Sequence, residues 1–270
     1  MNEASYRYIL CTIEGGIATV ILNRPEMLNS LNFDILAETR DALKRSMKAG
    51  VRVVIITGAG RGFCAGADLA SNSTQLIEKS EITGATDVGT LLEEYYNPFV
   101  RDLMNLEVPL ITALNGVAAG AGISVALMGD FIIASRSAVF KAGFVNIGLI
   151  PDLGGSWLLP RLAGRQRAMA IALLGEALTA EKAADWGLVH EVVDDSALST
   201  RTQEIAEQIS RLPAKTVAAT KKAFRQAMEN DLSAQLCLEV DTQRALGRTY
   251  DFREGVMAFL QKRTPKFEHR

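Results

Sequence analysis

A strand, a helix and a second strand follow one another early in the chain, and this order most restricts the possible folds. Residues 8–22 form two β-rich runs on either side of Gly15-Gly16, a dipeptide typical of a hairpin turn. Residues 33–48 place apolar side chains at helical spacing among charges, and residues 51–57 are a mostly apolar, β-branched run. Because a helix that connects parallel strands crosses over in a right-handed sense, the sequence predicts an α/β fold.

The composition fits a large globular unit and excludes several classes of partner. Of the 270 residues, 48% are hydrophobic and 22% are charged, which is ordinary for a globular protein with a sizeable core. The net charge is -2 and no block of Lys and Arg is dense, so we expect neither nucleic acid nor a membrane surface as a partner. The N-terminus lacks a signal-peptide pattern and no apolar run reaches about 18 residues. We therefore expect a cytoplasmic protein.

Residues that bind metals or activate nucleophiles are few. Cys11, Cys64 and Cys237 are far apart and form no CxxC or Cys/His cluster, so the sequence indicates neither a disulfide framework nor a zinc site. His269 lies in the C-terminal tail, and His190 belongs to an alternating strand pattern that is typical of a surface or interface histidine. We expect no metal site and no histidine-activated nucleophile.

Two of the predicted strands are followed by turns of small residues, at 58–69 and 115–122. The second turn opens a short apolar helix at 123–128. Ligands of α/β folds commonly bind at the carboxyl ends of strands, and free N–H groups at a helix N-terminus favour negative charge. Main-chain N–H groups near Ala67 and Ala121 would therefore suit an oxyanion hole. Close packing of a helix on a strand would require the same glycines equally well.

The remaining chain divides into a β-containing part and a helical part. Residues 70–90 are polar and fit either a lid or a loose surface segment, and Thr179 and Ser196 are suitable helix N-caps. No Pro/Gly linker separates the helical C-terminal third, which we expect to pack on the core or on a neighbouring subunit. The patterns predict helices at 91–106, 165–174, 179–186, 196–211, 214–228, 232–246 and 251–262, and strands at 108–114, 130–135, 138–142 and 189–193.

Asp152 is a single carboxylate inside an apolar run. Ile150, Pro151 and Leu153 flank it, and a Gly-Gly step into a predicted helix follows. Desolvation raises a carboxyl pKa from about 4 toward values useful for proton transfer. An aspartate at this place would serve equally well as the N-cap of a helix that begins near Gly154. Considered alone, the residues support both interpretations.

Taken in chain order, a set of short motifs resembles one known family over nearly the whole chain. The motifs are Asn23-Arg-Pro, Gly62-Phe-Cys-Ala-Gly-Ala-Asp-Leu, Asn115-Gly-Val-Ala-Ala-Gly-Ala-Gly, Asp130, Ile150-Pro-Asp-Leu-Gly-Gly, the segment 178–193 and Glu254-Gly-Val-Met-Ala-Phe-Leu-Gln-Lys-Arg. They resemble the enoyl-CoA hydratase/isomerase, or crotonase, superfamily. The resemblance implies a spiral of β-β-α units in residues 1–195, a helical trimerisation region in residues 196–270, and a homotrimer or homohexamer.

The resemblance also implies an acyl-CoA substrate, with coenzyme A as part of the substrate and no separate cofactor. By the same resemblance, the N–H groups of Ala67 and Ala121 would hold the thioester oxygen, where a fixed donor typically contributes about 3 to 4 kcal/mol. Phe259 and Lys262 would contact coenzyme A bound by a neighbouring subunit. Asp68 would hold its loop by accepting main-chain N–H groups. The residues implied to lie along the adenine part of coenzyme A are Ala65, Gly66, Ala67, Asp68 and Leu69.

Two positions depart from the pattern of the hydratases. Ser124 and Phe144 stand where hydratases of the family have catalytic glutamates, and neither side chain can act as a carboxylate base. Hydration needs two acid/base groups to activate and place a water molecule, so the sequence argues against it. We expect Ser124 to face the pocket without acting as a nucleophile, and Phe144 either to line the pocket or to pack in the core. The position of Asp152 bears an aspartate in isomerising relatives, which favours a base over a cap.

The sequence therefore predicts an isomerase in which Asp152 moves a proton and two main-chain N–H groups hold an enolate oxygen. Within the family, the stretch around Asp152 is most similar to isomerases of ring-1,2-epoxyphenylacetyl-CoA in phenylacetate degradation, which form an oxepin and also shift 3-enoyl to 2-enoyl double bonds. An aliphatic 3-enoyl-CoA or dienoyl-CoA isomerase of fatty acid oxidation is the first alternative. A non-catalytic binding or assembly subunit with the same fold is the second.

Overall fold

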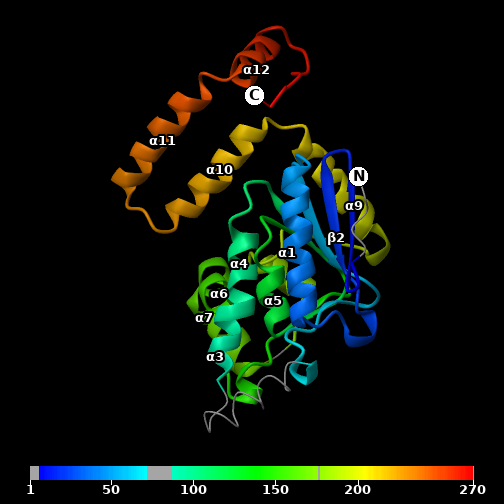
Figure 1. Cartoon of the computed structure of the whole chain (residues 1–270). Helices are drawn as coiled ribbons and strands as arrows, with labels where there is room; N and C mark the ends of the chain where they lie inside the picture. Colours follow the sequence, from blue (N-terminus) through cyan, green and yellow to red (C-terminus); the bar gives the residue numbers. More distant parts are fainter. Residues whose placement is uncertain (1–5, 72–86, 176, 270) are drawn as a thin grey trace.

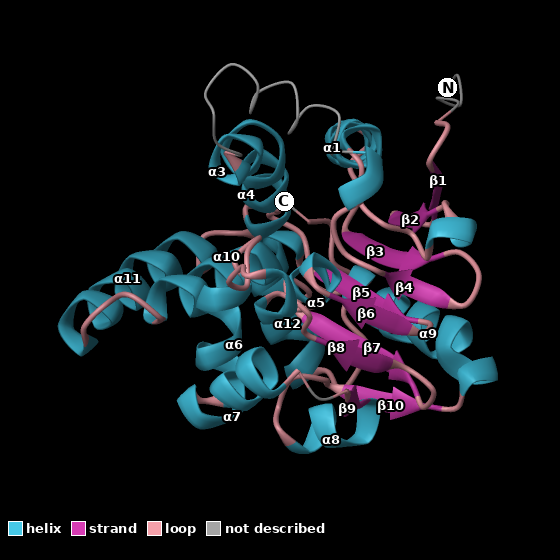
Figure 2. Ribbon diagram, turned by 90° about the horizontal axis from the view of Figure 1, so that it is seen from below, coloured by secondary structure: helices cyan, strands magenta, loops and turns pink. Residues whose placement is uncertain are grey.

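The strands form two sheets, which Figure 2 shows beside one another. The computed structural model describes residues 6–71, 87–175 and 177–269. Its six-stranded sheet has the order β1 (Ile9–Glu14), β2 (Ile17–Leu22), β3 (Val53–Gly58), β5 (Leu110–Leu114), β7 (Phe131–Ser135) and β10 (Glu191–Val193). Its four-stranded sheet has the order β4 (Gly62–Cys64), β6 (Val117–Ala119), β8 (Val139–Lys141) and β9 (Leu178–Thr179).

Successive strands alternate between these sheets. Strands β3, β5 and β7 pair in parallel in the larger sheet, and each is followed by a short strand, β4, β6 or β8, that pairs in parallel in the smaller one. A helical segment then leads to the next pair, so the predicted spiral of β-β-α units is confirmed. The predicted hairpin is also confirmed, because β1 and β2 are antiparallel and Gly15 and Gly16 have φ of 56° and 79°.

The helices follow the predicted pattern with small shifts at their ends. Wider helical turns at Leu92–Tyr96 and Ala170–Leu174 continue two of them. The bounds are α1 (Phe33–Lys48), α3 (Val88–Leu91), α4 (Asn97–Met104), α5 (Ala121–Ala126), α6 (Gly155–Ala163), α7 (Arg165–Met169), α8 (Ala180–Asp185), α9 (Leu198–Ser210), α10 (Ala214–Ala227), α11 (Leu232–Leu246) and α12 (Tyr250–Leu260).

One of the two predicted caps is correct. The hydroxyl of Thr179 accepts the N–H of Lys182 at the start of α8. Ser196 does not cap α9, because it lies inside a tight turn at Asp195–Ala197 and the residue before α9 is Ala197. The predicted polar segment at 70–90 falls largely on residues 72–86, which lie outside the described residues.

Helix α9 covers one face of the larger sheet. Its Ile205 and Ile209 share an apolar cluster with Ile55 of β3 and Ile111 of β5. The opposite face of the sheet belongs to a second, larger cluster that includes α1, α5 and the buried residues of the smaller sheet. The core therefore lies on both faces of the larger sheet, and the smaller sheet closes one side of it.

Helices α10, α11 and α12 leave this core. Figure 1 shows α10 and α11 side by side as an arm, with α12 and the C-terminus at its end. No residue of α10 or α11 is buried, although large apolar side chains such as Phe224 and Leu232 lie on them. None of the helices in the described ranges has the length and apolar character needed to cross a membrane.

Candidate active site

Three strand ends place the candidate site. The carboxyl ends of β4, β6 and β8 lie at one edge of the smaller sheet, and the residues that follow them line a common cavity of about 240 Å³. Ligands of α/β folds commonly bind at such an edge. The main-chain segments that border the cavity contain residues 65–67, 119–121 and 143–144.

The first main-chain donor, at Ala67, owes its direction to a parallel bridge with Leu31. The N–H of Leu31 donates to the carbonyl of Gly66 at 2.7 Å, and the N–H of Asp68 donates to the carbonyl of Leu31 at 2.9 Å. Because successive residues of an extended chain point to opposite sides, the N–H of Ala67 points away from Leu31. Within the described ranges this N–H has no hydrogen-bond partner.

The second donor, at Ala121, is the first residue of α5. The first N–H groups of a helix have no partner inside it, and the helix dipole favours an anion beside them. A Cβ placed on Gly66, whose φ is 95°, would lie 3.1 Å from the nitrogen of Ala121 and 2.8 Å from the carbonyl oxygen of Ala119. The two turns are therefore in contact, and the structure brings the predicted donor residues to one cavity.

Asp68 holds the loop that carries Ala67. Its carboxylate accepts Arg24 Nη2 at 2.8 Å, Ser71 N at 3.0 Å and Ser71 Oγ at 2.7 Å. Burial acts to raise the pKa of Asp68, but the bonds from Ser71 and Arg24 outweigh burial and hold this pKa below its usual value. The predicted loop-holding function is supported by these bonds, and the contribution of Arg24 was missed.

Asp152 lines the cavity with a carboxyl group that has few partners. Its Oδ1 atom is buried and makes no hydrogen bond to any described residue. Burial raises the pKa of Asp152 to about 6, although its own main-chain N–H acts in the opposite direction. The residue before α6 is Gly154, and no side chain caps this helix. The interpretation of Asp152 as an N-cap is therefore wrong.

The main chain after Asp152 is tightly turned. Leu153 and Gly154 have φ of 48° and 79°, in the left-handed region that costs a non-glycine residue about 1 to 3 kcal/mol. The carbonyl of Asp152 accepts the N–H of Gly155 and the hydroxyl of Ser124, each at 2.7 Å. These bonds hold the loop in a conformation that Leu153 alone disfavours.

The side chains around Asp152 are almost all apolar. The predicted residues Ala65, Gly66, Leu69 and Phe144 line the cavity, whereas Asp68 and Ser124 lie behind its wall. The helical segment from α3 to α4 contributes a wall of the cavity that the sequence did not predict. Its apolar side chains have the helical spacing of any helix that packs on a core. The lining residues not singled out from the sequence are Val88, Leu91, Leu92, Tyr96, Ala119, Gly120, Lys141, Gly143, Ile147 and Leu149.

Phe259 and Lys262 do not reach this cavity within their own chain. They belong to α12 and the turn after it, at the opposite end of the molecule from α3 in Figure 1. Phe259 is 82% exposed. Contact with coenzyme A bound by a neighbouring subunit stays a prediction.

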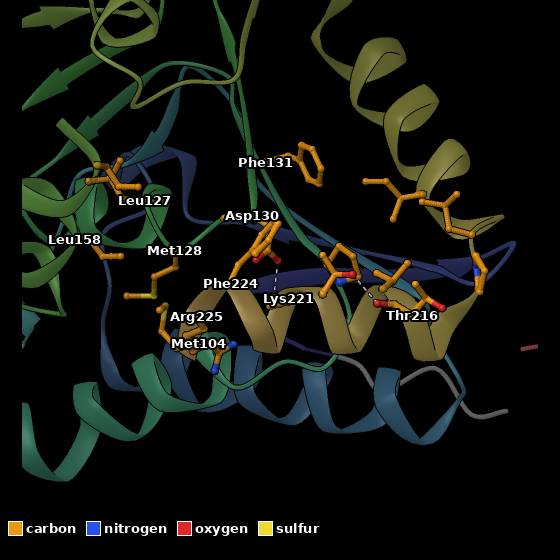
Figure 3. Close-up of a pocket in the computed structure, with 18 residues that line it drawn as sticks. Met104, Leu127, Met128, Asp130, Phe131, Leu158, Thr216, Lys221, Phe224 and Arg225 are labelled. Carbon is orange, nitrogen blue, oxygen red and sulfur yellow. Dashed lines mark hydrogen bonds and ion pairs between the residues drawn. The ribbon is translucent and has the colours of Figure 1, made fainter. Parts of the chain in front are cut away.

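A second and larger cavity, of about 590 Å³, lies between α10 and the core (Figure 3). Its walls are mainly apolar, with Met128 and Phe224 on facing sides. Its half-buried cation, Lys221, donates to Asp130 Oδ2 at 2.5 Å and to the carbonyl of Val108 at 3.0 Å. Because Asp130 is paired, this cavity offers no acid/base group comparable to Asp152 despite its size.

Comparison with known proteins identifies the family. The family model described as enoyl-CoA hydratase/isomerase matches residues 12–270, and the chain belongs to that family of enzymes. The chain is 48% identical over 262 residues to the 1,2-epoxyphenylacetyl-CoA isomerase of Escherichia coli, covering 96% of this chain and 98% of that protein. It is 35% identical to the trans-2-decenoyl-[acyl-carrier-protein] isomerase of Streptococcus mutans, covering 97% and 98%.

The solved structures agree with the crotonase fold. The enoyl-CoA hydratase/isomerase of Cupriavidus metallidurans superposes with a TM-score of 0.89 at 30% identity, covering 98% of this chain and 97% of that one. The enoyl-CoA hydratase of Bacillus anthracis superposes with a TM-score of 0.88 at 32% identity, covering 98% and 100%. Within the described residues, no cluster of three or more His, Cys, Asp or Glu could hold a metal ion.

Proposed function

We propose that the chain is an isomerase of acyl-CoA thioesters in which Asp152 is the proton-transferring base. One observation carries the proposal: the desolvated carboxyl of Asp152, whose Oδ1 atom has no partner among the described residues, lines the same cavity as Ala67 and Ala121, whose N–H groups also have no partner there. With a pKa near 6 this group is ionised at neutral pH, and its acid form is strong enough to return a proton.

For a 3-enoyl thioester, the Asp152 carboxylate takes a proton from the α carbon. The electron pair moves through the C–C bond to the thioester oxygen, where the N–H groups of Ala67 and Ala121 stabilise the negative charge. The resulting carboxylic acid then gives the proton to the γ carbon, and the double bond moves to the 2 position. No atom is gained or lost, so one carboxylate is sufficient and no cofactor beyond the coenzyme A of the substrate is needed.

An aromatic ring-epoxide thioester is the preferred substrate of this proposal. In the ring epoxide, the C–C bond shared by the epoxide and the six-membered ring breaks, which gives the seven-membered oxepin. Asp152 would then move the α proton to the ring carbon two atoms away, and the double bond would shift to the α carbon. The apolar walls, including Phe144, Leu91 and Tyr96, fit a flat ring and exclude water that would open the epoxide. The name of the Escherichia coli relative supports this choice.

An aliphatic enoyl thioester is the second candidate. The Streptococcus mutans relative is named for a ten-carbon acyl chain on a carrier protein, and the same apolar walls suit a hydrocarbon chain. In both candidates the chemistry at Asp152 is a 1,3-proton shift, so the two differ in the acyl group alone.

We further propose that the arm formed by α10 to α12 packs on neighbouring copies in a homotrimer or homohexamer. The arm exposes large apolar side chains, among them Phe224, Leu232 and Phe259, and the apolar cavity of Figure 3 lies at its base. This assembly would bring Phe259 and Lys262 of one copy to coenzyme A bound by the next. Light scattering of the full chain would measure the number of copies.

The test compares the wild type with Asp152→Asn on two substrates, a ring-1,2-epoxyphenylacetyl thioester and an aliphatic 3-enoyl thioester of coenzyme A. We expect conversion of the ring epoxide by the wild type and a fall of about 10²- to 10⁴-fold in kcat for Asp152→Asn, with binding of the thioester retained. Exclusive conversion of the aliphatic thioester would replace the preferred substrate by the second candidate. Unchanged turnover in Asp152→Asn would overturn the base, and a wild type that binds both thioesters but converts neither would favour a binding subunit.

A further inference from the structure

Ser124 joins the two elements that build the active site. It lies on α5, one helical turn after Ala121, and is only 1% exposed. Its hydroxyl donates to the main-chain carbonyl of Asp152 at 2.7 Å, and that carbonyl also accepts the N–H of Gly155, the first residue of α6. Helices α5 and α6 therefore each hold the peptide group of Asp152 by one hydrogen bond.

The contact between the two helices is close at this point. A Cβ on Gly155 would overlap the hydroxyl of Ser124, so α6 begins directly against this side chain. The chain between Asp152 and Gly155 passes through left-handed conformations at Leu153 and Gly154. Such a loop keeps its conformation only where surrounding bonds fix it, and Ser124 supplies the side-chain bond that does so.

We infer that Ser124 is a positioning residue for Asp152 in this isomerase. The inference rests on the proposed function of Asp152 as the base. Helix α5 carries at its first residue the N–H of Ala121, which has no partner among the described residues, and one turn later the hydroxyl of Ser124. One short helix therefore sets the distance between the oxyanion donor and the base. Ser124 does this without itself lining the cavity.

The test uses two variants at the same position. Ser124→Ala removes the donor and leaves a small gap, whereas Ser124→Cys fills the space with a much weaker donor. The matched control is Ser46→Ala, because Ser46 is also fully buried and its hydroxyl donates to a main-chain carbonyl, that of Ala42, at 2.8 Å in α1. All are measured on the CoA thioester that the wild type converts.

We expect kcat to fall about tenfold in both Ser124 variants with little change in KM, since a displacement of about 1 Å can cost up to about 100-fold. We also expect the acid limb of the kcat profile to move to lower pH, because a loosened loop lets water reach the carboxyl. The other titratable residues that line the cavity, Tyr96 and Lys141, are kept in every variant. The control should match the wild type, and wild-type kinetics in Ser124→Cys would overturn the inference in favour of simple packing.

Hydrogen–deuterium exchange separates this inference from the proposed function. In the unliganded full chain, Ser124→Ala should speed exchange of the Gly155 amide, whereas Ser46→Ala should leave it unchanged. Unchanged exchange together with unchanged kcat in Ser124→Ala would overturn the positioning function. Faster exchange in Ser124→Ala together with full activity of Asp152→Asn would instead show that Asp152 is not the base. The hydrogen bond from Ser124 would then still hold the loop, but without a function in catalysis.

Discussion

Two aspartates at the same cavity have opposite environments. Asp68, next to Ala67, is 3% exposed, and its carboxylate binds Arg24 and Ser71. Asp152 lines the cavity, and its Oδ1 atom has no partner in the part of the chain that the structure describes. The pKa of Asp68 is below its ordinary value, whereas burial raises the pKa of Asp152 to about 6.

Burial alone therefore does not decide what a carboxyl group can do. Both groups are desolvated, but a guanidinium and two donors make Asp68 a permanent anion that fixes a loop. Asp152 has no such guanidinium or pair of donors among the described residues, so it can take up and release a proton near neutral pH. The first group supports one oxyanion donor, and the second is the candidate reagent.

The largest expected effect is on stability, from Asp68→Ala. This change leaves Arg24 buried without its charged partner, which typically costs about 3 to 5 kcal/mol. Urea unfolding of the variant and the wild type measures the loss. The matched control is Asp241→Ala, which breaks an exposed pair with Arg244 and should cost no more than about 0.5 kcal/mol. An equal loss of unfolding free energy in the two variants would mean that the buried Arg24 pair contributes no more to stability than the exposed Arg244 pair.

A smaller effect of opposite sign is expected from Asp152→Asn. The pKa of Asp152 in the folded protein, about 6, exceeds its ordinary value of 3.8. Between these two pH values the folded protein therefore binds more protons than the unfolded chain. Wild-type stability therefore falls as pH rises from about 4 to 6 and stays lower above that range. Asp152→Asn does not undergo this loss and should be up to about 3 kcal/mol more stable at neutral pH. Thermal or urea unfolding across this range checks the sign, and a variant less stable than the wild type at neutral pH would contradict it.

The turnover of the wild type should also depend on pH, through the ionisation of Asp152. Because the base must be ionised, kcat/KM should be level above pH 6 and fall about tenfold for each pH unit well below it. Asp68 does not account for a limb near pH 6, since the bonds from Ser71 and Arg24 hold its pKa below its ordinary value. A steady-state profile measures the limb, and an inflection near pH 4 would show that Asp152 is solvated during turnover.

The smallest effect is expected from Tyr96→Phe. The hydroxyl of Tyr96 donates to the carbonyl of Leu31 at 3.2 Å, and the same carbonyl accepts the N–H of Asp68. Losing one such bond costs about 1 kcal/mol, and we expect kcat to fall about two- to threefold as the bridge between Leu31 and Ala67 loosens. Tyr95→Phe is the control, because it keeps the ring contact with Phe33. Equal stability and equal kcat in the two variants would contradict a contribution of the Tyr96 hydroxyl to the position of Ala67.

Local patterns predicted most of the fold, and the elements missed were those made by distant partners. The helix at Phe33–Lys48 and the hairpin at Gly15-Gly16 have signals within one stretch, and both are confirmed. Strands β4 and β6 are three residues each and were interpreted as parts of small-residue turns. Three residues are too few for alternation to show, and these strands exist because they pair with one another.

At the site too, local motifs predicted individual residues, whereas contacts between distant residues were not predicted. The motifs indicated Ala67, Ala121 and Asp152, and the structure brings all three to one cavity. The bonds that hold them in place were missed: Arg24 binds Asp68 across 44 positions of sequence, and Ser124, which the sequence placed in the pocket, binds Asp152 across 28. No local pattern reports such a bond, because its strength depends on burial that only the folded chain creates.

The donors at Ala67 and Ala121 also affect how mutations at this site are interpreted. Each is a main-chain N–H, and every amino acid except proline carries one. A scan that exchanges side chains one at a time would therefore detect Asp152 and pass over half of the site, and natural variation at positions 67 and 121 could leave catalysis intact. Only proline, or an ester in place of the amide, removes the donor itself.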